Sequence, residues 1–272
     1  MKSNFRKNIA LPQDHGSWVF ILSPLFIGFF ASEGFSGASI YLIVAAMAAF
    51  LIRQPVTIAT KAYSGRRPRT DLPAARFWML VYGIIALLVL FGLVRQGFIY
   101  ILYLALPGIS IFAWHLFLVS KRDERKQAGL EIVASGALAL AAPAALWVGK
   151  GSYDPAGWTL WVLAWLQSAA SIVHAYMRLE HRSLPEIPER SGQFQIGKRA
   201  ILYTGFNFIG TLVLGLIGWL PRFIFIPFLL QLAETLWWTY NPVIKIKPTT
   251  VGFRQLAVSI LFTVLFIVGW RI

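Results

Sequence analysis

Residues 53–69 read RQPVTIATKAYSGRRPR, a segment that begins inside an apolar run and ends in a basic loop. On a helix, its polar residues share one narrow stripe: Arg53, Thr57, Thr60 and Ser64, with Lys61 at the margin. An intramembrane arginine is costly and usually faces a wet cavity or a counter-ion. The stripe indicates that Arg53 faces such a cavity. The alternative is that the Arg53 side chain extends to the lipid headgroups and that the basic loop only sets the orientation of the chain in the membrane.

The composition outside this segment is that of a membrane protein. Hydrophobic residues make up 57% of the 272 residues and charged residues only 13%, and the number of long apolar runs excludes one or two soluble domains. A net charge of +14 suits nucleic acid, but in a multi-pass chain it reflects Lys and Arg gathered on the cytoplasmic side, so we expect no nucleic-acid partner. The chain has no cysteine, which excludes disulfides and thiolate chemistry.

The apolar runs predict an all-α fold, a polytopic membrane helical bundle of about nine transmembrane helices in a single domain over residues 1–272. The expected spans are 16–33, 39–62, 76–94, 97–118, 128–148, 158–178, 199–219, 221–241 and 252–270. The fifth span is rich in Ala, Ser and Gly, which let helix backbones approach closely. We therefore expect it in the middle of the bundle.

The distribution of Lys and Arg predicts the orientation. With the N-terminus inside, 21 of the 25 fall in inside segments, and only four fall outside: Arg95, Lys150, Arg222 and Arg271. Because positive charge gathers on the cytoplasmic side of membrane proteins, we expect a cytoplasmic N-terminus and an external C-terminus. The expected location is the bacterial inner (plasma) membrane.

Polar residues converge on the predicted cytoplasmic ends of the spans. They are the four histidines, His15, His115, His174 and His181, together with Asp14, Glu131, Asn207 and Glu234. This pattern is typical of a cavity open to the cytoplasm, although helix ends collect polar residues in any membrane protein. Glu234 is the only acid well inside a predicted span, so we expect a structural ion pair between Arg53 and Glu234.

His174, Arg178 and His181 are spaced i, i+4, i+7 and therefore lie on one face of the sixth span. Two histidines suggest a metal site, but the fixed charge of Arg178 between them opposes a cation, and no Cys ligand or HExxH pair accompanies them. We expect an anion-facing basic stripe and no metal, with a plain interfacial stripe as the alternative. The chain has no P-loop, no GxGxxG after a strand and no GxSxG elbow.

The segment LPQDHGSW at residues 11–18, the Arg53-Gln54-Pro55 turn and the overall layout resemble the YwiC-like family of bacterial integral membrane proteins. The layout is also similar to the UbiA prenyltransferase superfamily, which has nine helices, a cytoplasmic N-terminus and functional loops after spans two and six. The run KRDERKQAG at residues 121–129, which leads into a helix of small residues, resembles the middle of those enzymes.

In UbiA-type enzymes, Asp-rich motifs in these two loops hold Mg²⁺ on a prenyl diphosphate. The matching positions here carry no acid: Arg53, Gln54, Thr57 and Lys61 in the first motif, His174 and Arg178 in the second. The resemblance therefore implies a UbiA-like bundle without the metal cofactor and without an identified catalytic residue. Cations can pair with phosphate directly, where a carboxylate would need a bridging metal.

These observations predict a basic cavity that binds the headgroup of an anionic membrane lipid or an isoprenoid phosphate. Its expected residues are His15, Arg53, Gln54, Thr57, Lys61, His174, Arg178 and His181. Three alternatives stay open: a transporter or permease of an anionic or amphiphilic solute, a metal-free lipid-modifying transferase, and a non-catalytic membrane scaffold. The apolar outer halves of the spans and the lack of a clear internal repeat disfavour transport.

Overall fold

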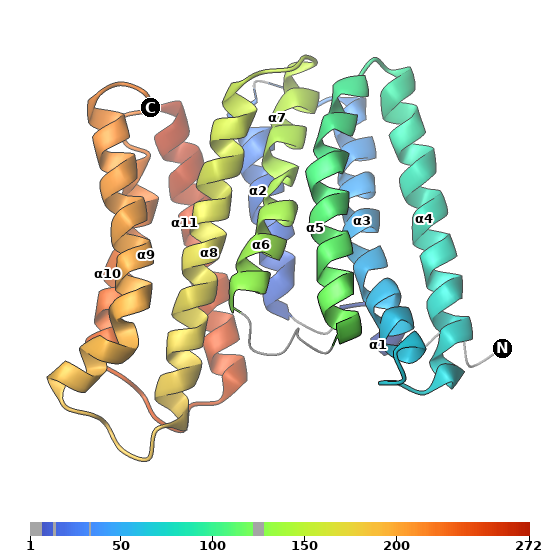
Figure 1. Ribbon diagram of the computed structural model, residues 1–272. Helices are drawn as coiled ribbons and strands as arrows, with labels where there is room; N and C mark the ends of the chain where they lie inside the picture. Colours follow the sequence, from blue (N-terminus) through green and yellow to red (C-terminus); the bar gives the residue numbers. More distant parts are fainter. Residues whose placement is uncertain (1–6, 13–14, 33, 122–127) are drawn as a thin grey trace. The chain divides into compact units, whose positions relative to one another are not determined.

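The computed structural model describes residues 7–12, 15–32, 34–121 and 128–272 (Figure 1). Over these residues the chain forms helices and connecting turns, with no strand. The predicted all-α fold class is therefore confirmed.

The helices fall into two compact units, Met1–Trp161 and Val162–Ile272. The helices and 3-10 turns of the first unit are α1 (Lys7–Ala10), η1 (His15–Trp18), α2 (Val19–Ala31), α3 (Gly37–Tyr63), η2 (Arg69–Asp71), α4 (Leu72–Arg95), η3 (Ile99–Ile101), α5 (Leu102–Lys121), α6 (Ala128–Ala139) and α7 (Ala141–Lys150). The second unit holds most of α8 (Ala156–Ser183) and all of α9 (Arg190–Leu216), α10 (Phe225–Tyr240) and α11 (Pro248–Arg271). The single domain expected from the sequence stays a prediction.

Within the described residues, seven helical segments are long and apolar enough to cross a membrane. They are Gly37–Tyr63, Arg69–Arg95, Ile99–Lys121, Ala128–Lys150, Ala156–Ser183, Arg190–Leu216 and Thr249–Arg271. The helices α2 and α10 are shorter, with 13 and 16 residues against the roughly 20 that a bilayer needs, and α2 is also apolar. Each of the nine predicted spans overlaps one of these helices, and the number nine itself stays a prediction.

The small-residue helix α7 lies in the core of the first unit, where its residues Ala141–Val148 are all buried. It packs against α2, and a Cβ atom added at Gly28 would overlap the backbone of Ala142 and come within 2.7 Å of the Ala145 Cβ. The two backbones approach this closely because neither helix has a large side chain at the contact. The burial of α7 agrees with the expected central position of the fifth span, whose place in the whole bundle stays a prediction.

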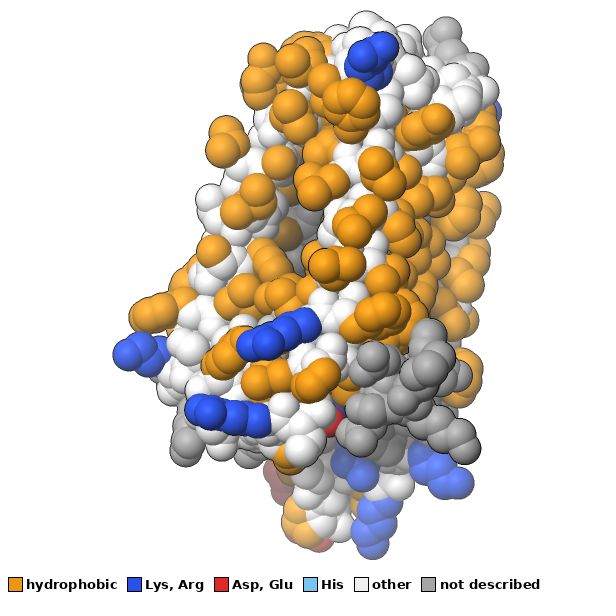
Figure 2. Space-filling model, turned by 90° about the vertical axis from the view of Figure 1, so that its right-hand side faces the viewer, with side chains coloured by type: hydrophobic (Ala, Val, Ile, Leu, Met, Phe, Trp, Pro, Cys, Tyr) orange, Lys and Arg blue, Asp and Glu red, His pale blue; other side chains and the backbone are white. Residues whose placement is uncertain are grey.

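The outward face of α4 is hydrophobic, with Leu80, Leu87, Leu88 and Phe91 each more than 60% exposed. Figure 2 shows a face on which hydrophobic side chains cover most of the height, while most of its Lys and Arg lie in the lower part. Apolar surface of this extent suits lipid and is rare on proteins in water. The sequence-based prediction of a multi-pass membrane protein is confirmed, whereas its membrane and its orientation remain predictions.

The basic connection between α3 and α4 lies against the end of α5. The Nη2 atom of Arg66 donates a hydrogen bond to the carbonyl oxygen of Val119, and the Nε atom of Arg67 donates to Asp71 over 2.6 Å. These contacts hold the Lys and Arg of the α3–α4 connection against the C-terminal end of α5.

One local expectation was wrong. The Arg53-Gln54-Pro55 segment is not a turn, because α3 continues as a helix from Gly37 to Tyr63 through Pro55. Helix α9 begins at Arg190, nine residues before the predicted span 199–219, and its first turns are polar. Gln193 donates a hydrogen bond to the carbonyl oxygen of Pro188 over 3.0 Å, and Gly197 packs against Thr239 of α10. Tertiary packing therefore extends this helix beyond its apolar run.

Candidate functional site

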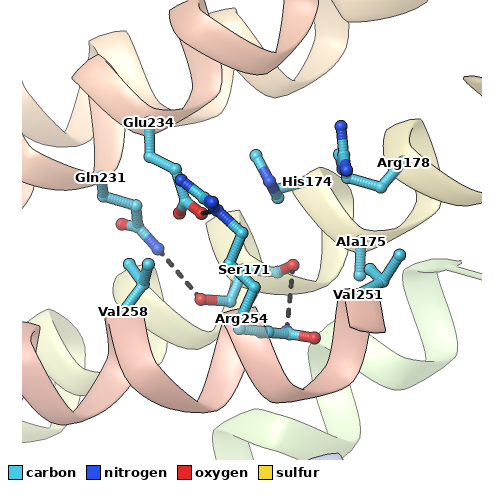
Figure 3. Close-up of a pocket in the computed structure, with 10 residues that line it drawn as sticks. Ser171, His174, Ala175, Arg178, Gln231, Glu234, Val251, Arg254 and Val258 are labelled. Atoms are coloured by element: carbon cyan, nitrogen blue, oxygen red, sulfur yellow. Dashed lines mark hydrogen bonds and ion pairs between the residues drawn. The ribbon is translucent and has the colours of Figure 1, made fainter. Parts of the chain in front are cut away.

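The second unit contains a small cavity of about 20 Å³ between α8, α10 and α11 (Figure 3). Its lining residues are Ser171, His174, Ala175 and Arg178 from α8, Gln231 and Glu234 from α10, and Val251, Arg254, Gln255 and Val258 from α11. A cavity of this size accommodates about one water molecule or one ligand atom with its hydrogens. On each helix the lining residues recur every three to four positions (i, i+3, i+4 and i+7 on α8 and on α11), so each helix presents one face to the cavity.

An ion pair joins α10 to α11 at the cavity. The Nε atom of Arg254 lies 3.3 Å from the Oε1 atom of Glu234 and donates a hydrogen bond to it (Figure 3). The Glu234 side chain is 11% exposed, whereas the Arg254 side chain is 50% exposed. The carboxylate is therefore the buried partner; Arg254 is the cation hydrogen-bonded to it, and Arg178 adds a second nearby positive charge.

The structure thus gives Glu234 a cation from the neighbouring helix of its own unit. The ion pair between Glu234 and Arg53 that was expected from the sequence would join the two units, and it stays a prediction.

Two arginines lie on the indole of Trp238. The guanidinium carbon of Arg178 is 3.6 Å from the ring centroid, and that of Arg254 is 4.4 Å from it. Arg178 is only 2% exposed, and its Nη1 atom has no hydrogen-bond partner among the described residues. A desolvated cation–π contact contributes about 2 kcal/mol, whereas desolvating the charge costs several kcal/mol. The nearby Glu234 carboxylate also attracts Arg178, but it is hydrogen-bonded to Arg254, so the charge of Arg178 is only partly compensated.

Charge at the cavity is positive on balance. Arg178 and Arg254 face it with fixed positive charges, and Glu234 is the one carboxylate among the lining residues. Such an excess of guanidinium groups over carboxylates attracts an anion, because guanidinium forms strong charge-assisted hydrogen bonds with carboxylate and phosphate oxygens.

Amide side chains line the other end of the cavity. The Nε2 atom of Gln231 donates to the Ser171 hydroxyl over 3.0 Å and to the Gln167 carbonyl over 3.1 Å. Gln255 donates to the Ser171 carbonyl over 3.3 Å. The Oε1 atom of Gln231 is buried and accepts no hydrogen bond from the described part of the chain. Two of the lining residues, Arg178 and Gln231, thus each have a buried polar atom without a hydrogen-bond partner in the described residues.

The histidine stripe of α8 is divided by the packing. His174 lines the cavity, is 8% exposed, and its Nδ1 atom lies 3.1 Å from the Thr235 hydroxyl. His181 is fully buried and does not line the cavity, and its ring nitrogens have no hydrogen-bond partner within the described ranges. In those ranges, no group of three or more His, Cys, Asp or Glu side chains is arranged to hold a metal ion.

The remaining predicted site residues belong to the first unit. Arg53, Gln54, Thr57 and Lys61 are half-buried on α3. The Thr57 hydroxyl donates to the Arg53 carbonyl over 2.8 Å, Gln54 donates to the Asn8 carbonyl over 3.2 Å, and the Arg53 guanidinium carbon lies 5.4 Å from the Phe50 ring centroid. His15 begins η1, but its side chain lies outside the described part of the structure, as does Asp14. Their role in headgroup binding stays a prediction.

Sequence reasoning missed Arg254, Gln231, Ser171 and Gln255 as cavity residues. A signal for Arg254 was present, because Glu234 lies six residues before the end of α10 at Tyr240 and Arg254 lies six residues after the start of α11 at Pro248. Antiparallel neighbours joined by a short connection place such residues at equal depth, about 9 Å along each helix.

The fold and the cavity define a multi-pass helical membrane protein with a buried basic site. The chain belongs to the YwiC-like protein family, and the family match covers residues 11–146. This match lies within the first unit and therefore does not include the cavity residues of the second. No curated protein and no solved structure matches the chain, so the likeness to UbiA enzymes stays a prediction.

Proposed function

We propose that the protein binds the anionic headgroup of a phosphate-bearing amphiphile, an isoprenoid phosphate or an anionic membrane lipid, at the cavity of the second unit. The observation that carries this proposal is Arg178, which is 2% exposed, faces the cavity and leaves Nη1 without a hydrogen-bond partner among the described residues. A buried cation of this kind is costly unless an anion arrives to pair with it.

The geometry suits a headgroup that enters from the Arg254 side. Arg254 is half-exposed, whereas Arg178 is buried, and both lie on the same indole of Trp238. The cavity of about 20 Å³ takes one phosphate oxygen beside Arg178, while the rest of the headgroup pairs with Arg254 at the rim. The apolar chain of the ligand then follows the exposed hydrophobic residues of α11, such as Phe253, Ile260 and Leu261.

The direct pairing of arginine with phosphate requires no metal ion. Arg178 and Arg254 supply the positive charge that Mg²⁺ supplies in carboxylate-rich diphosphate sites. The basic residues of α3, Arg53 and Lys61, were also expected from the sequence to bind a headgroup, and their role stays a prediction.

The test is a thermal-shift measurement on the purified protein in a neutral detergent with EDTA. Geranylgeranyl phosphate is expected to raise Tm, because a ligand that binds only the folded state stabilises it, whereas the neutral alcohol geranylgeraniol is expected to have no effect. Arg178→Met and Arg254→Gln should each abolish the shift. The matched control Arg222→Met, at an exposed arginine between α9 and α10, should retain it.

Two results would contradict the proposal. A shift that requires added Mg²⁺ would exclude direct arginine–phosphate pairing. The lack of a shift with geranylgeranyl phosphate and with short-chain phosphatidylglycerol would leave the scaffold alternative.

One observation favours transport of an anionic solute as a second candidate function. Buried polar side chains continue from the cavity toward the middle of the second unit, at Ser171, Gln167 and Ser168 of α8 and at Asn207 of α9, each at most 8% exposed. This supports a polar path that is deeper than the helix ends. Uptake of labelled phosphate ester into proteoliposomes would test it, and the Gln167→Leu variant should reduce the rate.

A further inference from the structure

We propose that the headgroup anion replaces Glu234 as the partner of Arg254, and that Glu234 takes up one proton when this exchange occurs. Anion binding is then coupled to protonation. The inference rests on the proposed function, because it describes how the same site admits its ligand.

The asymmetry of the ion pair determines which partner moves. Arg254 is 50% exposed and contacts Glu234 through Nε at 3.3 Å, so its guanidinium group can turn toward a ligand at the rim. Glu234 is only 11% exposed and lies on the cavity wall formed by α10. An incoming phosphate competes with this carboxylate for the same guanidinium group.

Once Arg254 and Arg178 pair with the phosphate, Glu234 is a buried carboxylate that has lost its hydrogen-bonded cation and lies beside a second anion. Both the burial and the repulsion disfavour its charged form, so a proton from solvent binds the carboxylate. No covalent bond changes, and a singly charged headgroup enters together with one proton. The net charge of the site is the same before and after binding.

The other charged and titratable groups at the cavity do not replace Glu234 in this role. From α8, Arg178 pairs with the same phosphate, and His174 uses Nδ1 in its contact with the Thr235 hydroxyl. From α11, the lining residue with a charge is Arg254 itself. The charged residues of α9, which are Arg190, Lys198 and Arg199, are not among the lining residues.

The experiment uses dihexanoyl phosphatidylglycerol, whose phosphodiester keeps a single negative charge throughout the pH range tested. Isothermal titration calorimetry at pH 6, 7 and 8, in two buffers with different ionisation enthalpies, gives both Kd and the number of protons taken up. In the wild-type protein we expect about one proton per ligand and a Kd that rises with pH, approaching about tenfold per pH unit. The proton count needs no variant.

The Glu234→Gln variant keeps the shape of the side chain and removes its charge. It should bind with a Kd independent of pH and more tightly than the wild type at pH 8, because the internal competitor for Arg254 is neutral. Glycerophosphoglycerol, which is the same headgroup without acyl chains, distinguishes a free phosphate ester from a lipid as the natural ligand. If the lipid binds and glycerophosphoglycerol does not, the natural ligand is a lipid.

Three outcomes would overturn the inference. Wild-type binding that is independent of pH and takes up no proton overturns it while leaving the proposed function intact. A pH dependence that persists in Glu234→Gln but disappears in His174→Gln assigns the proton to His174 instead. A failure of the wild-type protein to bind any phosphate amphiphile overturns the proposed function and this inference together.

Discussion

The guanidinium carbon of Arg178 lies 3.6 Å from the centroid of the Trp238 ring, in surroundings where the arginine is 2% exposed. The indole face offers the cation some compensation but no negative charge, and Nη1 lacks a hydrogen-bond partner in the described residues. A neutral side chain of similar length would fill this position at lower free energy. A residue that lowers stability at a cavity is typical of a site selected for binding.

Arg178→Met should therefore raise the stability of the ligand-free protein. Replacing a buried ionic group by a well-packed apolar one is neutral or stabilising, here by about 1–3 kcal/mol. Detergent thermal-shift measurements should give a higher Tm for Arg178→Met, while the exposed control Arg222→Met should leave Tm unchanged. A lower Tm for Arg178→Met would indicate that the arginine has a stabilising partner.

Trp238→Leu should destabilise the protein more in the wild-type background than in the Arg178→Met background. The difference is the coupling between the indole and the guanidinium group, expected at about 1–2 kcal/mol for a desolvated cation–π pair. A double-mutant cycle of unfolding free energies in SDS measures it. The control Trp237→Leu, at a tryptophan that is 60% exposed, should show no coupling to Arg178. Strict additivity at Trp238 would refute the interaction.

Two glycines of α9 should respond to alanine with opposite signs. A Cβ atom at Gly197 would overlap the side chain of Thr239, whereas a Cβ atom at Gly205 would meet nothing within 4 Å. Gly197→Ala should therefore separate α9 from α10 and lower the unfolding free energy by about 1–3 kcal/mol. Gly205→Ala should raise it by up to about 1 kcal/mol, because alanine restricts the unfolded chain. If Gly197→Ala and Gly205→Ala change the unfolding free energy in SDS equally, the close packing of Gly197 against Thr239 is contradicted.

Asp154 should stabilise the start of α8 in a pH-dependent way. The hydrogen bond from the Lys150 Nζ atom at 2.5 Å, followed by the one from the backbone N–H of Ala156 at 2.7 Å, lowers the pKa of the Asp154 carboxyl below its ordinary 3.8. A lowered pKa in the folded state contributes stability that is complete above the unfolded value and is lost as the pH falls through the folded value.

Asp154→Ala is accordingly expected to cost about 1 kcal/mol at pH 7, the usual effect of losing a capping side chain. Thermal unfolding followed by circular dichroism measures the loss of stability of Asp154→Ala relative to wild type. This loss should be as large at pH 5 as at pH 7 and smaller below about pH 3.8. A difference that stays constant down to pH 2 would mean that the charge of Asp154 contributes nothing.

Reporter fusions should reveal the orientation of the chain. Gly65 lies in the basic connection after α3, and Gly218 lies in the turn after α9. With positive charge inside, alkaline phosphatase should be inactive when fused after Gly65 and active when fused after Gly218. The reverse pattern of activities would invert the topology.

Much of the helical architecture followed from sequence patterns with a simple physical cause. A bilayer requires apolar runs of about 20 residues, so hydropathy alone located a helix at every predicted span. The helical period likewise placed His174 and Arg178 on one face of α8, and both line the cavity. The sequence was misleading for α9, whose polar first turns are held in a helix by the packing of Gly197 against Thr239.

The partners of the charged side chains were decided only by the tertiary structure. Residue spacing relates side chains on one helix, but it specifies neither which helices are neighbours nor how each is rotated about its axis. From the sequence, Arg53 was the expected partner of Glu234, and that pair stays a prediction. The packing of α10 against α11 places the Nε atom of Arg254 3.3 Å from the Oε1 atom of Glu234. The same packing places the guanidinium groups of Arg178 and Arg254 over the ring of Trp238. Two arginines from different helices thereby meet at one basic cavity.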